Sequence, residues 1–295
     1  MTSLSRREFL GQSAVAVGAL ALAPRLHSAD PPAKPKGAAD LVSLGRTGIK
    51  TSLLGLGTGS IGIKHSSNQV RLGQEKFTKL VRYAYDQGIR YFDTADQYGS
   101  HIFLRDALKG LPREKVFIQT KTRARTADQA KADVDRFREE LGVEYIDSLL
   151  MHCMTEENWP STFKGVMDVL SDAKAKKWVK AVGVTCHGLK PLTTASKTEW
   201  VEIDQARINP VGGDRGRMDG TPEEVAAVLK AMHEAGKGVL GMKILAEGTL
   251  KTEEDQVKSL RYVLGLGSVD AFVIGFESTE QIDQIVKRIE IALKD

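Results

Sequence analysis

Ala271-Phe272-Val273-Ile274 is an uninterrupted apolar run, and Ser278-Thr279-Glu280-Gln281 follows it after three residues. An apolar run without alternation is typical of a parallel strand that is covered on both faces. A serine followed three residues later by a glutamine forms a capping box and marks the start of a helix. The stretch therefore predicts a buried strand that passes directly into a helix, which is the basic unit of an α/β fold.

The same unit recurs along the chain. Strands are predicted at Leu53–Thr58, Tyr91–Ala95, Val116–Thr120, Ser148–His152, Val179–Thr185, Val201–Gln205, Gly238–Ile244 and Ala271–Gly275. Amphipathic segments lie between them, and Thr221-Pro222-Glu223-Glu224 supplies a further helix start. Eight such units over residues 40–295 predict a single-domain α/β protein, a (β/α)8 TIM barrel. A doubly wound sheet is the alternative, but Gly55-x-Gly57-x-Gly59 lies on a strand end and does not open a helix.

The first 29 residues predict a signal peptide. Arg6-Arg7 precedes Phe9-Leu10, and an apolar run over 11–23 ends before the small residues Ser28 and Ala29, which is the order that a signal requires. The segment resembles a twin-arginine signal, which exports folded proteins. We therefore expect a periplasmic or exported protein, with the twin-arginine export machinery as a partner. Residues 30–39 are expected to form a short extended linker.

Composition excludes several classes of protein. The chain carries 42 Lys+Arg against 38 Asp+Glu, a net charge of +4. Removing the signal peptide takes away three arginines and one glutamate, which leaves 42 − 3 = 39 against 38 − 1 = 37, or +2. Such a balance argues against a nucleic-acid-binding protein. The two cysteines exclude a disulfide-dense scaffold and a four-cysteine zinc site. No apolar run reaches the ~20 residues that a membrane span needs, so no stable membrane span is expected after cleavage.

Four polar side chains stand at consecutive strand ends, where a barrel places its chemistry. Asp93 lies near the end of the second predicted strand and Tyr98 follows it, Lys121 follows the third, and His152 ends the fourth. Each one alone has a structural explanation: a turn cap, a surface charge, a satisfied histidine. Together they form a general acid/base, because an ammonium lowers the pKa of a phenol from its usual value near ~10 and a carboxylate holds that ammonium. Such a set suits a carbonyl or alcohol, and reduction at carbon requires a hydride from a nicotinamide.

The chain resembles the aldo/keto reductase family over residues 40–295. The resemblance rests on Phe92-Asp93-Thr94-Ala95 with Tyr98-Gly99, on Thr120-Lys121-Thr122, on Tyr145-Ile146-Asp147 five residues before His152, and on Gly183-Val184-Thr185 and Val273-Ile274-Gly275. In that family the equivalents of Asp93, Tyr98, Lys121 and His152 form a catalytic tetrad. The resemblance implies that Tyr98 is the general acid, that Lys121 lowers its pKa, that Asp93 supports Lys121, and that His152 orients the carbonyl.

The resemblance also implies a site for NADP or NAD. Thr185 and Gln205 occupy positions that hold the nicotinamide carboxamide, and Met242 stands where a stacking tyrosine is usual. The remaining implied cofactor contacts are Gly57, Thr58, Lys243, Glu277, Ser278 and Gln281. The segment 275–281 contains two acids and no basic residue, and Gln281 replaces a family arginine. Because a carboxylate would repel the 2′-phosphate, we expect weak NADP selectivity, with NAD tolerated or preferred.

Two arginines are candidate substrate contacts. Arg123 lies two residues beyond Lys121, and Arg207 two beyond Gln205, so each shares the inward face if its strand continues. Guanidiniums there would favour a carboxylate, phosphate or sugar. The alternative is that each pairs with a neighbouring acid such as Asp214 or Asp219. The Gly-rich segment 209–220 is either a mobile lid or a solvated connection.

No metal site is expected. His152 and Cys153 are adjacent on a predicted strand, and neighbouring residues on a strand point to opposite faces, so the two cannot readily share one metal with Cys186 and His187.

The predicted function is hydride transfer between a nicotinamide cofactor and the carbonyl or alcohol of a small polar substrate: a sugar, a keto acid or an aldehyde. One alternative is an exported nucleotide-binding or regulatory barrel with little turnover. The other is a lyase or hydrolase that uses Tyr98 and Lys121 without a hydride. Nucleotide carried by the purified protein would argue against the lyase, and turnover with carbonyl compounds would separate the enzyme from the binding protein.

Overall fold

A computed structural model describes residues 35–294. These residues all belong to one unit of the chain, Lys34–Asp295. The expected signal peptide at 1–29 and the first half of the expected linker lie outside the described residues. Within 35–294, no helix combines the length and the apolar character that crossing a membrane requires.

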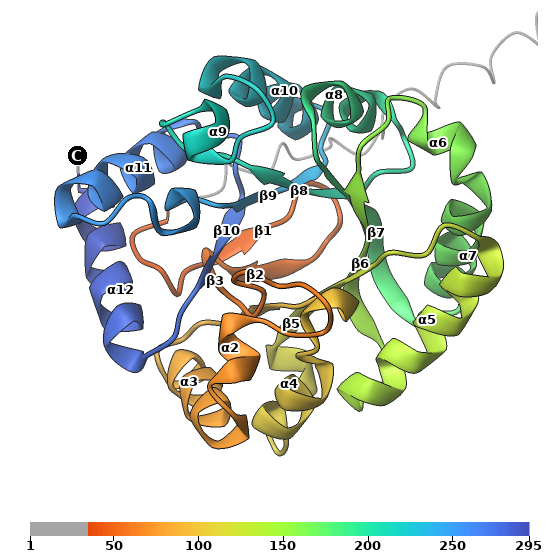
Figure 1. Ribbon diagram of the computed structural model, residues 1–295, viewed down its shortest axis with the longest axis horizontal. Coiled ribbons are helices and arrows are strands. Elements are labelled where there is room, and N and C mark those ends of the chain that lie inside the picture. The colour runs from red at the N-terminus through yellow and green to blue at the C-terminus, as the bar shows by residue number, and fades with distance from the viewer. Residues whose placement is uncertain (1–34, 295) are drawn as a thin grey trace, which may run out of the picture. The chain divides into compact units, whose positions relative to one another are not determined.

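Eight parallel strands close into a barrel in the order β10-β3-β4-β5-β6-β7-β8-β9, and helices surround it (Figure 1). The strands are β3 (Leu54–Gly57), β4 (Tyr91–Asp93), β5 (Phe117–Thr122), β6 (Ile146–Met154), β7 (Val179–Cys186), β8 (Ile203–Arg207), β9 (Gly238–Met242) and β10 (Ala271–Gly275). The predicted (β/α)8 barrel is therefore confirmed. Side chains that alternate along each strand fill its interior and the layer beneath the helices.

The α-helices within the described residues are α2 (Asn68–Arg71), α3 (Gln74–Asp86), α4 (His101–Leu108), α5 (Ala127–Leu141), α6 (Trp159–Thr162), α7 (Lys164–Ala175), α8 (Leu189–Lys197), α9 (Gly213–Gly216), α10 (Pro222–Glu234), α11 (Glu253–Gly265) and α12 (Thr279–Leu293). Single 3₁₀ turns are η1 (Asp96–Tyr98), η2 (Arg113–Lys115) and η3 (Ala246–Gly248). The capping box at Thr221 and Glu224 is present. The one predicted at Ser278 is half formed: Ser278 accepts a bond from the Gln281 N–H, but the Gln281 side chain accepts from the Glu277 N–H instead.

Several strand boundaries differ from prediction because pairing uses the backbone, whereas hydropathy reports only side chains. β5 runs on to Thr122, since Thr120, Lys121 and Thr122 pair with β6 despite their polar side chains. Conversely, β8 begins two residues later than predicted, because the Val201 N–H is bonded in a turn to the Thr198 carbonyl.

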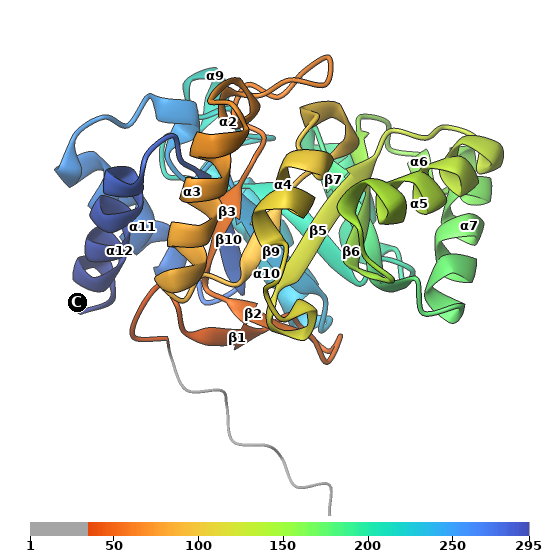
Figure 2. The same ribbon diagram turned by 90° about the horizontal axis from the view of Figure 1, so that it is seen from below.

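A hairpin that the sequence did not predict closes the end of the barrel where the strands begin (Figure 2). Its strands β1 (Leu41–Ser43) and β2 (Lys50–Ser52) are antiparallel. Leu44 inserts from it into the barrel floor, fully buried beside Tyr91 and Phe117. Gly45 has a φ of +48°, and a Cβ there would lie 2.4 Å from the Gly236 carbonyl oxygen. The hairpin leaves the opposite end, where the strands finish, for the site.

Candidate active site

Lys121 and Asp93 form a buried ion pair at the end where the barrel strands finish. The Lys121 Nζ donates to Asp93 Oδ1 at 2.6 Å and to the Thr94 carbonyl at 2.9 Å. The two residues are 1% and 4% exposed. Burial lowers the pKa of Lys121 below its ordinary value, while the neighbouring Asp93 opposes that shift. Each charge compensates the other, so removal of either one would leave the partner buried and unpaired.

Tyr98 lies against this pair, held by two glycines. Its ring centroid is 5.1 Å from the Lys121 Nζ. A Cβ at Gly59 would stand 2.2 Å from the ring, and one at Gly62 would stand 2.4 Å from it. The loop after β3 therefore presses its bare backbone against the ring, and only glycine permits that approach. The sequence offered Gly59 as a signal, but only as part of an imperfect nucleotide-binding motif.

The proton on Tyr98 is held more firmly than the sequence predicted. Burial is the largest cause that raises the pKa of Tyr98 well above 10, and the acidic groups of Asp93, Cys153 and Glu247 add to it. The net shift is upward, and the lowering of this pKa by Lys121 stays a prediction. The positive charge of Lys121 is paired with Asp93, so it does not offset the loss of solvation at the phenol. The hydroxyl of Tyr98 consequently stays protonated through neutral pH.

His152 faces Tyr98 from β6. The two rings meet edge to face, with centroids 5.8 Å apart and an interplanar angle of 87°. His152 is 6% exposed, and its Nδ1 has no hydrogen-bond partner within the described part of the chain. Burial, followed by the positive charge of Lys121, lowers the pKa of His152 well below 6.5. The imidazole is therefore neutral at pH 7 and has a free nitrogen for a ligand.

A backbone irregularity brings Cys153 to the same end of the barrel. Cys153 has a φ of +59°, and the β6–β7 register shifts between Met151 and Met154. Its Sγ lies 3.5 Å from the His187 Nε2. This bulge interrupts the regular alternation of the strand, on which the expectation of opposite faces for His152 and Cys153 rests. No group of three or more His, Cys, Asp or Glu side chains that could hold a metal occurs among residues 35–294.

A network centred on Arg136 of α5 supports the turn that carries Tyr98. Arg136 donates to Asp96 at 2.8 Å, to Asp133 at 2.8 Å and to Glu140 at 2.9 Å. Asp96 opens the same 3₁₀ turn that ends at Tyr98. The sequence did not point to these residues, because salt bridges between a helix and a distant loop leave no periodic pattern.

The same network reaches β5 on both sides of Lys121. The His101 ring is hydrogen-bonded through Nδ1 to the Glu140 carboxylate at 2.7 Å and through Nε2 to the Thr120 hydroxyl at 2.7 Å. The Thr122 hydroxyl donates to the Asp133 carboxylate. The residues before and after Lys121 are thus tied to α4 and α5 through side chains.

Glu140→Gln tests this network by its pH dependence. The hydrogen bond from His101, followed by that from Arg136, lowers the pKa of Glu140 from 4.5 to about 2. A lowered carboxyl pKa stabilises the fold above the unfolded value near 4.5, and this contribution fades as pH falls toward 2. We expect the variant to be less stable than the parent at pH 7, with the gap shrinking in urea titrations at progressively lower pH. Glu139→Gln, an exposed neighbour, is the control. An equal gap at every pH would contradict the assignment.

The predicted carboxamide contacts, Thr185 and Gln205, both lie inside the barrel end and are fully buried. The Gln205 Nε2 is 3.3 Å from Asp93 Oδ1, and its Oε1 has no hydrogen-bond partner among the residues described. The Thr185 hydroxyl accepts from the Cys153 N–H at 2.9 Å. A buried amide oxygen without a donor costs free energy unless a ligand supplies one, so this position fits a nicotinamide carboxamide.

The other predicted cofactor residues differ in whether their side chains are free to contact a ligand. Gly57 pairs with β4 and β10, and Met242 packs on the interior cluster of the barrel. Thr58 is fully buried, and its hydroxyl is used by the Asp93 carbonyl and Ser100, so its side chain is structural. Lys243 forms an ion pair with Glu247.

The start of α12 is already supplied with negative charge. Asn68 donates to the Glu277 carboxylate at 2.6 Å, and the Gln281 Oε1 accepts from the Glu277 N–H at 2.7 Å. The pKa of Glu280 is lowered by a hydrogen bond from its own backbone N–H and then by Ser278. A carboxylate of the chain thus occupies the helix N-terminus that would otherwise receive a phosphate.

The two candidate substrate arginines lie in different surroundings. Arg123 falls just beyond β5, is exposed, and donates to the Gln97 Oε1 at 2.6 Å. Arg207 does continue β8 on the face of Gln205, and it forms an ion pair with Asp219 at 2.7 Å. The pairing with a neighbouring acid therefore holds for Arg207. Asp219 also accepts from the Gly188 N–H at 2.7 Å, which ties the segment 209–220 to the barrel.

The comparisons with known proteins agree on one family. The model of the aldo/keto reductase family matches residues 53–260. "Probable aldo-keto reductase 1" of Glycine max is 28% identical over 54% of this chain and 51% of its own length. "Glycerol 2-dehydrogenase (NADP(+))" of Saccharomyces cerevisiae is 28% identical (54% and 53%), and "NADH-specific methylglyoxal reductase" of Escherichia coli is 26% identical (48% and 50%). The chain thus spans about half the length of the curated relatives it matches.

Solved structures share the fold. The holo form of an aldo-keto reductase from Bacillus halodurans superposes with a TM-score of 0.69 at 19% identity, over 86% of this chain and 95% of that one. At this identity the likeness concerns the arrangement of strands and helices alone.

Proposed function

This chain belongs to the aldo/keto reductase family, and we propose that it transfers a hydride between a nicotinamide cofactor and the carbonyl or alcohol of a small polar substrate. The observation that carries the proposal is the buried pair of Lys121 and Asp93 beside Tyr98 and His152, at the end of the barrel where the strands finish. Sugars, keto acids and aldehydes are the substrate classes that we propose.

Each side chain of the site has a distinct role in the proposed reaction. The nicotinamide, when bound, supplies the hydride that no side chain can provide. The Tyr98 hydroxyl donates the proton to the carbonyl oxygen. Lys121 and Asp93 hold each other in place, and the neutral imidazole of His152 offers a polar contact that orients the substrate oxygen. Thr185 and Gln205 hold the carboxamide of the cofactor.

The protonation of Tyr98 favours reduction over oxidation. A raised pKa keeps the proton on the hydroxyl at neutral pH, as a proton donor requires. Alcohol oxidation needs a base at the same position, so we expect it to require a more alkaline solution.

A screen of aldehydes, 2-keto acids and sugars with NADPH and with NADH tests the proposal. We expect consumption of reduced nucleotide that depends on the carbonyl compound. Tight nucleotide binding without turnover across the panel would instead support the alternative, a nucleotide-binding barrel with little turnover. The absence of any nucleotide binding would support a lyase or hydrolase.

We propose further that this chain has weak NADP selectivity, with NADH tolerated or preferred. The family includes both an NADP-dependent and an NADH-specific relative. The carboxylates of Glu277 and Glu280 at the start of α12 would repel a 2′-phosphate. Titration of protein fluorescence with each reduced nucleotide should give dissociation constants within tenfold of each other or tighter for NADH.

The variant Glu280→Gln with Gln281→Arg should shift binding toward NADPH, because it removes an anion from the helix N-terminus and adds a cation. Glu290→Gln, exposed near the end of α12, is the control. Parent protein that binds NADPH more than tenfold tighter, a gap of about 1.4 kcal/mol, would contradict this expectation.

We also propose export to the periplasm through the twin-arginine machinery, on the strength of Arg6-Arg7 and the apolar run that follows. Arg6→Lys with Arg7→Lys should retain the folded protein in the cytoplasm. Arg25→Lys, outside the pair, should not. Cell fractionation with an activity or antibody readout measures how much protein reaches the periplasm. Normal export of the double variant would show that the paired guanidiniums are not recognised.

A further inference from the structure

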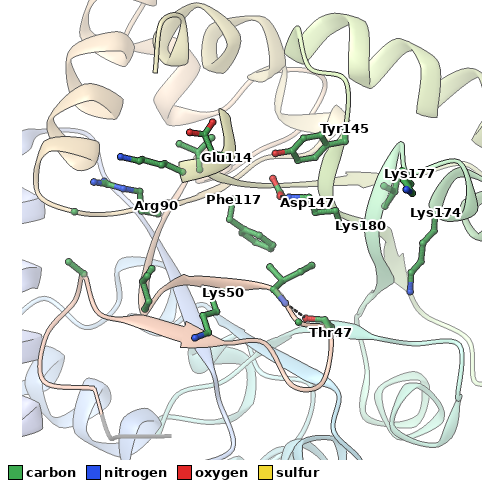
Figure 3. Close-up of a pocket in the computed structure, with 18 residues that line it drawn as sticks. Thr47, Lys50, Arg90, Glu114, Phe117, Tyr145, Asp147, Lys174, Lys177 and Lys180 are labelled. Carbon is green, nitrogen blue, oxygen red and sulfur yellow. Dashed lines mark hydrogen bonds and ion pairs between the residues drawn. The ribbon is translucent and has the colours of Figure 1, made fainter. Parts of the chain in front are cut away.

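A large hollow lies at the end of the barrel opposite Tyr98. It has a volume of about 1150 Å³ and opens between the hairpin β1–β2 and the beginnings of β5, β6 and β7 (Figure 3). Thr47 and Lys50 come from the hairpin on one side, and Tyr145 and Asp147 from the barrel on the other. The volume lies just above the range of small-molecule sites, about 300–1,000 Å³.

The lining is strongly basic. Two acids, Glu114 and Asp147, face six cations: Lys50, Arg90, Lys115, Lys174, Lys177 and Lys180. The lining thus carries 6 − 2 = +4, as much as the whole chain. The distribution of charge is therefore far from even over this molecule, and the excess would attract an anion.

Three of these six cations already have partners. Asp147 is already bonded to Lys180 at 2.9 Å and to Arg113 at 2.6 Å. Lys174 pairs with Glu202, and the Arg90 guanidinium donates to the Tyr85 carbonyl.

Three ammonium groups remain. Within residues 35–294, no hydrogen bond, ion pair or ring contact engages the side chains of Lys50, Lys115 and Lys177, which are all exposed. They come from β2, from η2 and from the turn after α7, so these ammonium groups are spread around the hollow on three separate segments.

The hollow also has an apolar surface. Leu41 is 65% exposed, and it lines the hollow together with Ile49 and the strand residues Phe117 and Val179. Leu41 and Ile49 thus place apolar surface beside the lysines of the hollow. A ligand with both an anionic group and an apolar body would contact both kinds of surface.

We propose that this hollow binds a small amphipathic anion: an aromatic or medium-chain carboxylate, sulfonate or phosphate. The anionic group pairs with an ammonium group of the lining, that of Lys50, Lys115 or Lys177, and the apolar body covers Leu41 and Ile49. The site is separate from the proposed reaction, because the interior of the barrel stands between the hollow and Lys121. An inorganic anion would leave Leu41 uncovered, and a neutral hydrocarbon would leave three like charges without a counterion.

Fluorescence titration of the full chain tests the proposal. The probe is anilinonaphthalene sulfonate, with phenylnaphthylamine as the same ring system without the anionic group. The test variant carries Lys50→Gln, Lys115→Gln and Lys177→Gln. The matched control carries Lys76→Gln, Lys131→Gln and Lys287→Gln, three exposed lysines on helices elsewhere. All six positions are on the surface, so circular dichroism should show both variants folded.

The sulfonate should bind the parent and the control alike, and at least tenfold more weakly to the test variant, a difference of about 1.4 kcal/mol. Leu41→Gln should weaken the same probe several-fold. Equal losses in the two triple variants, or equal affinity of the parent for the neutral probe, would overturn the proposal. A short polyglutamate peptide that binds more tightly than the sulfonate, with the same lysine dependence, would also overturn it and make the hollow a docking site for an acidic protein segment.

Discussion

Tyr98→Phe should lower kcat/KM for carbonyl reduction by about 10²–10⁴-fold, the usual contribution of a positioned general acid. The substitution removes one hydroxyl and keeps the ring that Gly59 and Gly62 enclose. The affinity for reduced nucleotide should therefore stay close to that of the parent, and so should the urea midpoint. Steady-state kinetics and nucleotide titration on the same preparation measure the two effects separately.

Tyr85→Phe is the matched control, because the Tyr85 ring packs under Arg90, away from the site. It should leave kcat/KM unchanged. Activity of Tyr98→Phe within a few-fold of the parent would remove Tyr98 from the role of proton donor, whatever the identity of the substrate.

Lys121→Met should have the largest effect on stability. It leaves the carboxylate of Asp93, 4% exposed, without its cation. Breaking a buried pair in this way costs about 3–5 kcal/mol, so the unfolding midpoint in urea should fall sharply, and reduction should be lost with it. Lys131→Met, at an exposed helix position, should change stability by no more than about 0.5 kcal/mol.

The double variant Lys121→Met with Asp93→Asn separates stability from activity. Removing both charges eliminates the unpaired carboxylate, so much of the lost stability should return. Activity should not return, because the ammonium beside Tyr98 is still absent. A double variant as unstable as the single one would show that the ion pair is not what Lys121 contributes to the fold, and recovered activity would show that Lys121 is dispensable for the reaction.

The sequence predicted the barrel because its strands are buried on both faces. Runs such as Ala271–Ile274, bounded by a helix start, are typical of a strand in a covered parallel sheet. The candidate site was predictable for a related reason. Burying a charged group such as Lys121 at the end of an apolar strand costs free energy, so its presence there indicates a functional role. The structure brings Asp93, Tyr98, Lys121 and His152 together, and their catalytic roles stay predictions.

What the sequence could not supply depends on contacts between distant segments. The positive φ of Cys153 accompanies a register shift between β6 and β7, which alternation along a single strand does not predict. The direction of the Tyr98 pKa shift depends on burial and then on the nearby charge of Asp93, and a sequence motif does not record how deeply a side chain is buried. The hairpin β1–β2 has strands of only three residues, too short for a hydrophobic period to stand out.

The most direct measurement of the central claim is isotopic. The protein is incubated with reduced nicotinamide nucleotide deuterated at the transferring carbon and with the panel of aldehydes, 2-keto acids and sugars, and the products are weighed by mass spectrometry. The account predicts an alcohol that carries one deuterium on the former carbonyl carbon, formed by the parent protein and lost with Tyr98→Phe. Nucleotide that binds but yields no deuterated alcohol from any member of the panel would contradict it.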